Sequence, residues 1–267
     1  NDNDALLGAI DTGVACVILE PIVFESPRPG FLHDVRRLCS DHGVVLIFDE
    51  MWTGFRISPG GAQHHFGVDA DLACFSKAVA NGMPLSVLTG RREIMRRLDD
   101  DVFFYTTFGG EALSLAAAKA TLQVLEREMV PAVLGARGNR LREGVQSLIA
   151  NMDLDYVTCI GYPQRTMLAI KPPNGVDALV AKSFMQQEMI RCGILWSGFH
   201  NLSYAHTDDD IDYLIEAYRE ILPRLDMAIH GGNLAAELRG SPVAPVFRRT
   251  SEFNMKPVRT REVSRLP

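Results

Sequence analysis

Apolar runs and amphipathic segments alternate along the first part of the chain. Gly13–Leu19 is a continuous apolar run rich in β-branched residues, which predicts a buried strand ending at Glu20. Phe31–His42 carries apolar residues at helical spacing, and Gly43 follows it as a helix-terminating glycine. Val44–Phe48 is a second apolar run of the buried-strand type. The pattern therefore reads strand, helix, strand.

Two shorter runs continue the alternation. Asp71–Phe75 predicts a third strand, and Leu85–Thr89 is a candidate for a fourth. Strands that alternate with helices form a parallel sheet, because each crossover helix returns the chain to the same edge. We therefore expect an α/β unit with a parallel sheet.

The pattern changes in the second half of the chain. Leu113–Glu128 is an alanine-rich helical segment, and Pro131 suits the start of a helix over Ala132–Ile149. Beyond residue 150 we expect a strand at Thr166–Ile170, a helix at Asp177–Arg191, a short apolar stretch at Ile194–Trp196 and a helix at Asp209–Leu225. This order predicts a smaller α+β domain.

These segments divide the chain into three parts. Residues 1–130 form the α/β part, residues 131–230 the smaller domain, and residues 231–267 a tail. The tail contains seven Lys or Arg residues against three Asp or Glu residues and lacks clear apolar periodicity. We expect it to be a basic, loosely ordered extension.

Composition narrows the classes of function. The chain has 267 residues, of which 47% are hydrophobic and 22% charged, as in an ordinary soluble globular protein. A net charge of −6 argues against a nucleic-acid surface, and the longest apolar run is too interrupted to span a membrane. Five scattered cysteines predict reduced thiols and a cytoplasmic location.

Ionisable residues stand at the ends of three successive predicted strands. They are Glu20, Asp49 and Lys77. A single charge in such a place is usually just the first solvated residue after a buried run. In open parallel sheets, however, ligands bind beyond the carboxyl ends of the strands, and three such residues favour a site there.

A lysine and an aspartate at neighbouring strand ends suit one cofactor, pyridoxal 5'-phosphate (PLP). The amine of Lys77 can form a Schiff base with an aldehyde. An aspartate such as Asp49 can keep a pyridine nitrogen protonated, which makes the ring an electron sink. The two residues alone do not identify this chemistry, because Asp and Lys are common.

A longer motif carries a family resemblance. Val44–Arg56 (VVLIFDEMWTGFR) is followed by Gly60–Gln63, Phe66–Val68, Ala70–Leu72 and Ser76-Lys77. Together these blocks resemble the class III aminotransferases, PLP-dependent enzymes of fold type I, and most of all their glutamate-1-semialdehyde aminomutase-like branch. The resemblance spans about residues 10 to 228. It implies a partial large α/β domain with a mostly parallel sheet, a small C-terminal α+β domain, and amino-group transfer by an aminotransferase or aminomutase.

The resemblance also implies residue roles around the cofactor. Asp49 would contact the pyridine nitrogen, and Lys77 would form the internal aldimine. Met51 takes the position that packs under the pyridine ring. Thr107, in a Thr-Phe-Gly-Gly element, would reach across a homodimer interface to the partner's cofactor phosphate.

Substrate-side positions match the family less well. Glu20 lies in a matching Leu-Glu-Pro element, and Glu25 has the spacing of a substrate-side glutamate in some ω-aminotransferases, which act on small amines and keto or aldehyde compounds. Trp52 replaces a glutamine that in many members bonds the ring hydroxyl. The arginine that often binds a substrate carboxylate would fall near Phe199-His200, so recognition there is not expected.

Family members also carry an additional N-terminal segment with a phosphate-binding loop, and no such loop is found here. The chain could be a fragment, one of two chains, or the product of a decayed gene, and alone it should show little activity. The main alternative function is a catalytically inert structural or regulatory protein. A nicotinamide-dependent enzyme is disfavoured, because no strand is followed by a glycine-rich fingerprint.

Three histidines are candidate ligands of another kind. His64 and His65 are adjacent, and His206 precedes the last predicted helix. No third metal ligand stands at a regular spacing, so we expect structural roles for all three.

Overall fold

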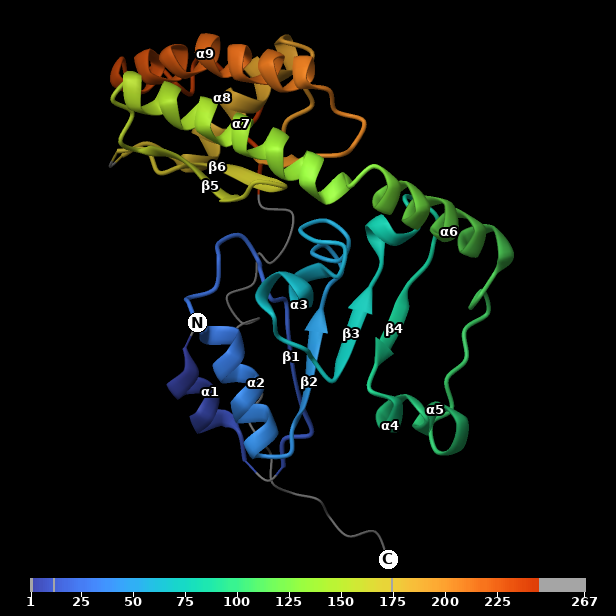
Figure 1. The fold of residues 1–267 in the computed structure, drawn as a ribbon. Helices are drawn as coiled ribbons and strands as arrows, with labels where there is room; N and C mark the ends of the chain where they lie inside the picture. The colour runs from blue at the N-terminus through green and yellow to red at the C-terminus, as the bar shows by residue number, and fades with distance from the viewer. Residues whose placement is uncertain (1, 12, 174, 245–267) are drawn as a thin grey trace, which may run out of the picture.

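The computed structural model describes residues 2–11, 13–173 and 175–244, which build two units, each around its own sheet (Figure 1). The elements of the first unit are α1 (Asn3–Ala9), β1 (Cys16–Leu19), α2 (Phe31–Asp41), β2 (Val45–Asp49), α3 (Gly61–Phe66), β3 (Leu72–Phe75), the 3-10 turn Lys77–Val79, β4 (Val87–Gly90), α4 (Arg92–Met95) and α5 (Arg97–Asp100). The predicted strands and the helix after β1 are present, whereas the sequence pattern missed the short helices α1, α3, α4 and α5.

The first sheet is parallel except at one edge. Its strand order is β1-β2-β3-β4; β1, β2 and β3 run parallel and β4 runs antiparallel to β3. The expectation of a mostly parallel sheet is therefore confirmed, with the fourth strand as the exception. The connection from β3 to β4 holds only a 3-10 turn and a loop, and a parallel crossover needs a dozen or more residues.

The two faces of this sheet differ in cover. On one face α2 packs against β2, and Val35, Cys39, Leu46 and Phe48 form its fully buried centre. On the other face Ile18 of β1 is 61% exposed. The prediction that the first strand is buried is wrong within the described residues, because β1 is an edge strand and no described element covers its outward face.

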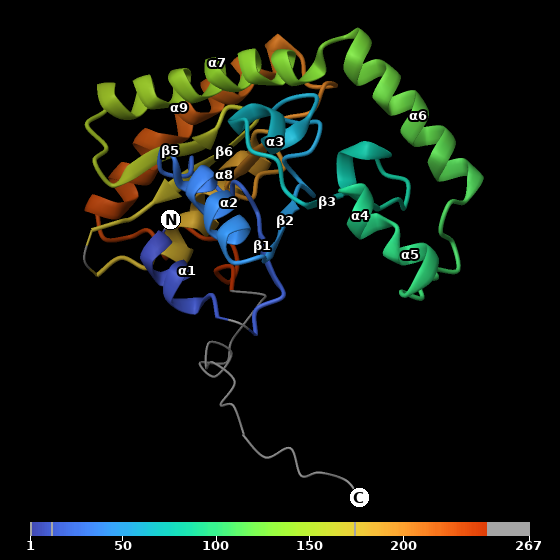
Figure 2. The same cartoon turned by 60° about the horizontal axis from the view of Figure 1, so that its bottom comes forward.

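The second unit is helices packed on an antiparallel sheet. The helix α6 (Ala112–Arg127) leads into it, and Ala118 of α6 is buried with Val79 and Ala80 of the first unit. The elements of the second unit are α7 (Val130–Asn151), β5 (Val157–Tyr162), β6 (Arg165–Ile170), α8 (Ala178–Arg191), β7 (Phe199–Asn201) and α9 (Asp208–His230). The strands are ordered β5-β6-β7, with α7, α8 and α9 layered against them (Figure 2). The short apolar stretch Ile194–Trp196 lies just before β7. The pattern also missed β5.

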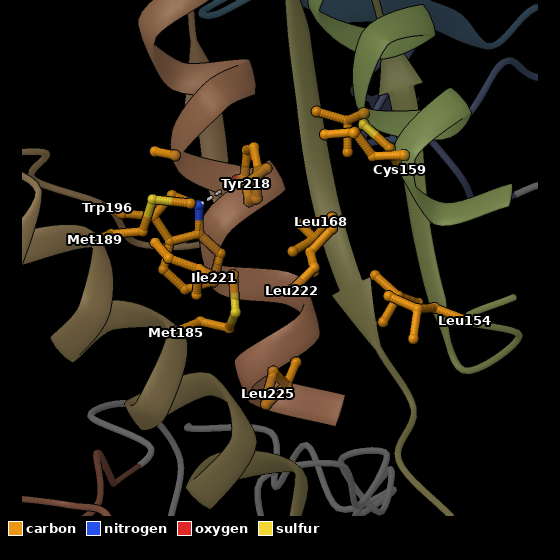
Figure 3. Close-up of a cluster of buried hydrophobic side chains, with 14 of the residues drawn as sticks. Leu154, Cys159, Leu168, Met185, Met189, Trp196, Tyr218, Ile221, Leu222 and Leu225 are labelled. Atoms are coloured by element: carbon orange, nitrogen blue, oxygen red, sulfur yellow. Dashed lines mark hydrogen bonds between the residues drawn. The ribbon is translucent and has the colours of Figure 1, made fainter. Parts of the chain in front are cut away.

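A buried polar chain runs through the core of the second unit. The indole Nε1 of Trp196 donates to the Tyr218 hydroxyl at 2.6 Å, and His200 Nε2 lies 2.5 Å from the same oxygen. The Thr166 hydroxyl lies 2.7 Å from His200 Nδ1. Apolar side chains such as Met185, Ile221 and Leu222 pack around this chain (Figure 3). These bonds tie β6, β7 and α9 together.

The segment after α9 lies along α8. Leu234 is buried against the core of the second unit, and Val243 N donates to Ser183 Oγ at 2.8 Å. The first residues of the expected loose tail, 231–244, are therefore anchored to the second unit at Leu234 and Val243 although most of them are exposed. Residues 245–267 lie outside the described part of the chain.

Two further observations concern the described residues. All five cysteines are free thiols. No described helix has the length and apolar character needed to cross a lipid bilayer.

The second unit lies beyond the carboxyl ends of β2 and β3, whose arrows point toward it in Figure 1. The Arg56 guanidinium joins the units, because its Nη1 donates to the carbonyl oxygens of Leu202 at 2.7 Å and Gln164 at 3.2 Å. The strand ends that carry the candidate residues therefore face the boundary between the two units.

Candidate functional site

Asp49 is the last residue of β2, and its carboxylate is held by the turn that follows. Its Oδ1 accepts a hydrogen bond from the Met51 backbone N–H at 2.9 Å. Asp49 is paired in register with Cys74 on β3, and burial followed by the negative charge of Asp49 raises the pKa of the Cys74 thiol. The side chain is half-buried, so one carboxylate oxygen is oriented while the group stays reachable from the boundary.

Lys77 begins the 3-10 turn directly after β3. Its φ of 49° lies in the left-handed region, which is uncommon for a residue with a side chain. The preceding Ser76 donates its hydroxyl to the Leu85 carbonyl at 2.7 Å, which fixes the turn to the following loop. Lys77 is exposed, and within the described residues no hydrogen bond or ion pair engages its amine. Strain of this kind recurs at functional sites.

Glu50 supports the same region and was not singled out by the sequence reasoning. Its carboxylate is 1% exposed and accepts hydrogen bonds from the Thr53 hydroxyl at 2.6 Å and from the backbone N–H groups of Ala62 and Gln63 at 2.7 and 3.0 Å. These bonds fasten the turn after β2 to the start of α3. The signal available in the sequence was a second acid directly after Asp49.

The predicted substrate-side residues lie beside one cavity. Glu20 and Glu25 line a cavity of about 540 Å³ together with Leu19 and Phe24. Both glutamates are exposed, and they belong to the segment that leaves β1. The cavity is flanked by apolar side chains, so it offers a mixed surface to a small organic molecule.

Thr107 lies apart from these residues along the chain. It belongs to residues 102–110, an exposed segment without regular structure that follows α5. Phe103 is 93% exposed there, and Phe104, Tyr105 and Phe108 are exposed as well. The described chain therefore places Asp49, Met51 and Lys77 at the ends of the adjacent strands β2 and β3. The aromatic side chains around Thr107 stay exposed, with Phe103 and Tyr105 stacked on each other at a centroid distance of 6.5 Å.

Trp52 stands at the position of the family glutamine, but its side chain is bonded within the protein. It is buried, and its indole Nε1 donates to the Ile22 carbonyl at 2.8 Å. The single donor of its side chain is thus already used to join the turn after β2 to the segment after β1. The hydrogen bond that a glutamine would offer to a ring hydroxyl is not available from Trp52.

The position expected for a carboxylate-binding arginine holds no cation. His200 is buried in the polar chain of the second unit, and burial lowers its pKa to about 4. Phe199 stacks on Phe24 with ring centroids 5.5 Å apart. Sequence reasoning did not single out Arg165, whose guanidinium lies against the same two rings.

The three histidines considered as metal ligands have protein contacts. His64 Nδ1 lies 2.5 Å from the Ser58 hydroxyl, and His65 packs edge-on against Tyr162 with centroids 5.8 Å apart. His206 Nδ1 accepts from the Ser203 backbone N–H at 2.9 Å. Over the part of the chain that the structure describes, no three candidate ligands gather as a metal site would require.

Comparison with known proteins identifies relatives for this arrangement. The family model of aminotransferase class-III matches residues 3–187. The chain is 33% identical over 233 residues to 3-aminobutyryl-CoA aminotransferase of Cloacimonas acidaminovorans, covering 83% of this chain and 56% of that protein. It is 36% identical over 236 residues to glutamate-1-semialdehyde 2,1-aminomutase of Methanococcoides burtonii, covering 82% and 56%. The chain thus spans little more than half the length of these relatives.

Solved structures agree on the fold. A transaminase with PLP bound superposes with a TM-score of 0.79 at 23% identity, covering 86% of this chain and 57% of that one. A glutamate-1-semialdehyde aminomutase from Pseudomonas aeruginosa PAO1, in complex with PMP, gives 0.73 at 24% identity, with 84% and 55% covered. The fold type expected from the motif is confirmed, and the chain belongs to the class III aminotransferase family.

Proposed function

We propose that the protein to which this chain belongs transfers amino groups with PLP, held covalently by Lys77. The observation that carries the proposal is the placement of Lys77 and Asp49 at the carboxyl ends of the adjacent parallel strands β3 and β2. Ligands of open α/β sheets bind at this edge. The proposal accounts for an unengaged amine in a strained turn beside an oriented carboxylate.

The residues present fit such a cofactor. The Asp49 carboxylate keeps one oxygen, Oδ2, without a hydrogen bond within the described residues, so it can accept from a protonated ring nitrogen. Met51 is half-buried in the same turn. When bound, PLP supplies an electron sink for the bond that breaks at the substrate carbon.

The roles of the chain's own groups follow from their chemistry. Lys77 Nζ would hold the aldehyde carbon of the cofactor; once released by a substrate amine, it would carry a proton between the substrate carbon and the cofactor carbon. Asp49 would keep the pyridine nitrogen protonated. Glu20 and Glu25 would face the substrate from the segment after β1. Lys77 and Asp49 would have the same roles in an aminotransferase and in an aminomutase.

A labelling experiment tests the role of Lys77. The chain is mixed with PLP and reduced with borohydride, and the labelled peptide is mapped by mass spectrometry. Label should appear on Lys77 and disappear in Lys77→Arg, which keeps the positive charge. Lys119→Arg, a change at an exposed lysine of α6, should leave the labelling intact. Label spread over several lysines, with none favoured, would refute the assignment.

A second experiment tests Asp49 in the complete protein. Asp49→Ala should lower the rate of amine transfer by roughly 10³-fold or more, because the ring nitrogen loses the carboxylate that keeps it protonated. Asp49→Glu retains a carboxylate and should retain far more activity. Near wild-type turnover of Asp49→Ala would contradict the role.

We also propose that the complete protein is a homodimer whose interface includes residues 102–110. The support is that four aromatic side chains are exposed in this segment, more than a monomer normally leaves in contact with water. The double substitution Phe103→Ser and Phe104→Ser should lower the molecular mass measured by analytical ultracentrifugation toward that of a monomer. Leu195→Ser, at a side chain that is also 93% exposed but lies in the second unit, should not. A dimer unaffected by the double change would exclude this interface.

An inert structural or regulatory protein is the alternative, because the chain spans little more than half of its relatives. We expect the 267-residue chain alone to transfer little or no amine. The outward face of β1 is bare, and the donors that usually cradle a phosphate at a helix start are not among the residues that match the motif. Assays with several amino donors and keto acids test this expectation. Robust turnover abolished by Lys77→Ala would overturn it.

A further inference from the structure

We propose that Arg165 is the anchor for a carboxylate of the amine substrate, supplied from β6 instead of from the segment before α9. This inference rests on the proposed function for the identity of the ligand. Arg165 is the first residue of β6, at the turn that joins it to β5. Its guanidinium lies against the ring of Phe199. The family resemblance places a carboxylate-binding arginine near Phe199-His200, and this chain has no arginine at those two positions.

Three aromatic rings hold the guanidinium. Its central carbon lies 5.0 Å from the ring of Trp52, 5.2 Å from Phe24 and 5.4 Å from Phe199. Trp52 follows β2, Phe24 follows β1, and Phe199 begins β7, so elements from both units converge on one cation. Contacts of this kind restrict the side chain while leaving its hydrogen-bond donors unused.

The charge of Arg165 has no counter-ion among the described residues. Over residues 2–11, 13–173 and 175–244, no ion pair or hydrogen bond engages the guanidinium, and its Nε is buried without an acceptor. Arginine stays charged at any ordinary pH, and a buried donor without a partner costs free energy. Such a donor in a folded protein calls for an explanation, and an anionic ligand would provide one.

A second cation strengthens the positive field. Burial, and then the nearby charge of Arg165, lowers the pKa of Arg56. Arg56 already donates to the carbonyl oxygens of Gln164 and Leu202, so it is committed to joining the two units. Arg165 is the member of the pair whose donors are free to bind an anion.

The position of the pair connects it to the candidate site. Trp52 lies three residues after Asp49 and is bonded to Ile22 in the segment after β1. Phe24, in the same segment, also borders the cavity lined by Glu20 and Glu25. A substrate that reaches this boundary would therefore meet a planar, fixed guanidinium, whose fork matches a carboxylate. The substrate class that this favours is amines bearing a carboxylate, over simple alkyl amines.

Binding can be tested without the cofactor. The Nε–H resonance of Arg165 in a nitrogen-15 NMR spectrum, identified by its loss in Arg165→Lys, is followed during titration with β-alanine and, separately, with propylamine, which lacks the carboxylate. It should shift and saturate with β-alanine and not with propylamine. The resonance of Arg219, an exposed arginine of α9, is the control within the same spectrum. No saturable shift with β-alanine, or equal shifts with both amines, would overturn the proposal.

The variants Arg165→Met and Arg219→Met extend the test. Arg165→Met should weaken β-alanine binding, measured by calorimetry, by roughly 10- to 100-fold, as expected for the loss of a charged hydrogen bond. Arg219→Met should leave it unchanged. If Arg165→Met fails to fold, Arg165→Lys decides, since it keeps the charge but loses the fork and should bind more weakly. Unchanged binding in a folded Arg165 variant contradicts the proposal.

The outcome is separable from that of the proposed function. If borohydride labelling finds no PLP on Lys77 but β-alanine still shifts the Arg165 resonance, the cofactor chemistry is wrong and the anion site stands. If Lys77 is labelled but β-alanine does not shift the Arg165 resonance, the cofactor proposal stands and the carboxylate anchor is rejected.

Discussion

Acid should destabilise the second unit through His200. This imidazole is buried in the polar chain with Thr166 and Tyr218, and burial lowers its pKa to about 4 against an ordinary value of 6.5. The folded protein therefore binds fewer protons at this group than the unfolded chain between these two pH values. Stability from His200 is fully present above pH 6.5 and is lost as the pH falls toward 4.

The size of this effect follows from the two pKa values. Across the window the free energy of unfolding should fall by about 1.4 kcal/mol for each pH unit, or about 3 kcal/mol in all. That is a large share of the 5–15 kcal/mol typical of a folded domain. Because Trp196 donates to the same Tyr218 hydroxyl, its fluorescence should report the loss of this core (Figure 3).

Urea denaturation followed by tryptophan fluorescence at pH 4.5, 5.5, 6.5 and 7.5 measures the effect. Carboxylates also titrate in this range, so the quantity compared is the difference between the wild type and His200→Gln. The variant should be less stable at pH 7.5 but less sensitive to acid. His33→Gln, at an exposed histidine of α2, should follow the wild type. Parallel pH profiles for the wild type and His200→Gln would refute the reasoning.

Four further substitutions test the packing and the buried hydrogen bonds. In Gly138→Ala the new methyl group would lie 1.8 Å from the Pro163 carbonyl oxygen, so α7 must move and the free energy of unfolding should fall by about 3 kcal/mol or more. Gly135→Ala on the same helix meets only a flexible side chain at 3.2 Å and should be neutral or slightly stabilising in thermal melts, and equal effects would contradict this account. Glu50→Gln turns an amide group toward backbone donors and should lower the free energy of unfolding in urea by about 2 kcal/mol. An unchanged midpoint would mean that the bonds from Glu50 to the start of α3 do not stabilise the fold. Asp71→Asn, which weakens bonds to two arginines and to a backbone N–H, should cost about 2–3 kcal/mol by the same assay, and a neutral result would count against a structural role.

Local patterns were sufficient for most elements of the chain. The strand that ends at Asp49 and the helix from Phe31 were recognisable because apolar periodicity reflects burial on one face, a property of a few neighbouring residues. Short elements such as α3 escaped, because a helix of only six residues, with a glycine at each cap, carries little periodicity. The direction of β4 escaped as well, because it depends on the path of the connecting loop.

The candidate site divides in the same way. Asp49 and Lys77 could be named from the sequence because each directly follows an apolar run, and parallel strands bring such ends to one edge. Glu50 could not be given its role, because its acceptors are satisfied by backbone groups twelve and thirteen residues away. The exposure of β1 was also unpredictable, since burial depends on which elements cover a face.

What the sequence by itself determined was the family, the order along the chain of the strands that lead to Asp49 and Lys77, and a smaller α+β second unit. These follow from motifs and periodicities within short stretches of chain. Only the tertiary structure placed Arg165 among Phe24, Trp52 and Phe199 and beside Arg56. The reason is physical: a guanidinium surrounded by rings from separate loops exists only after two units have packed together, and no local pattern records which distant residues will meet.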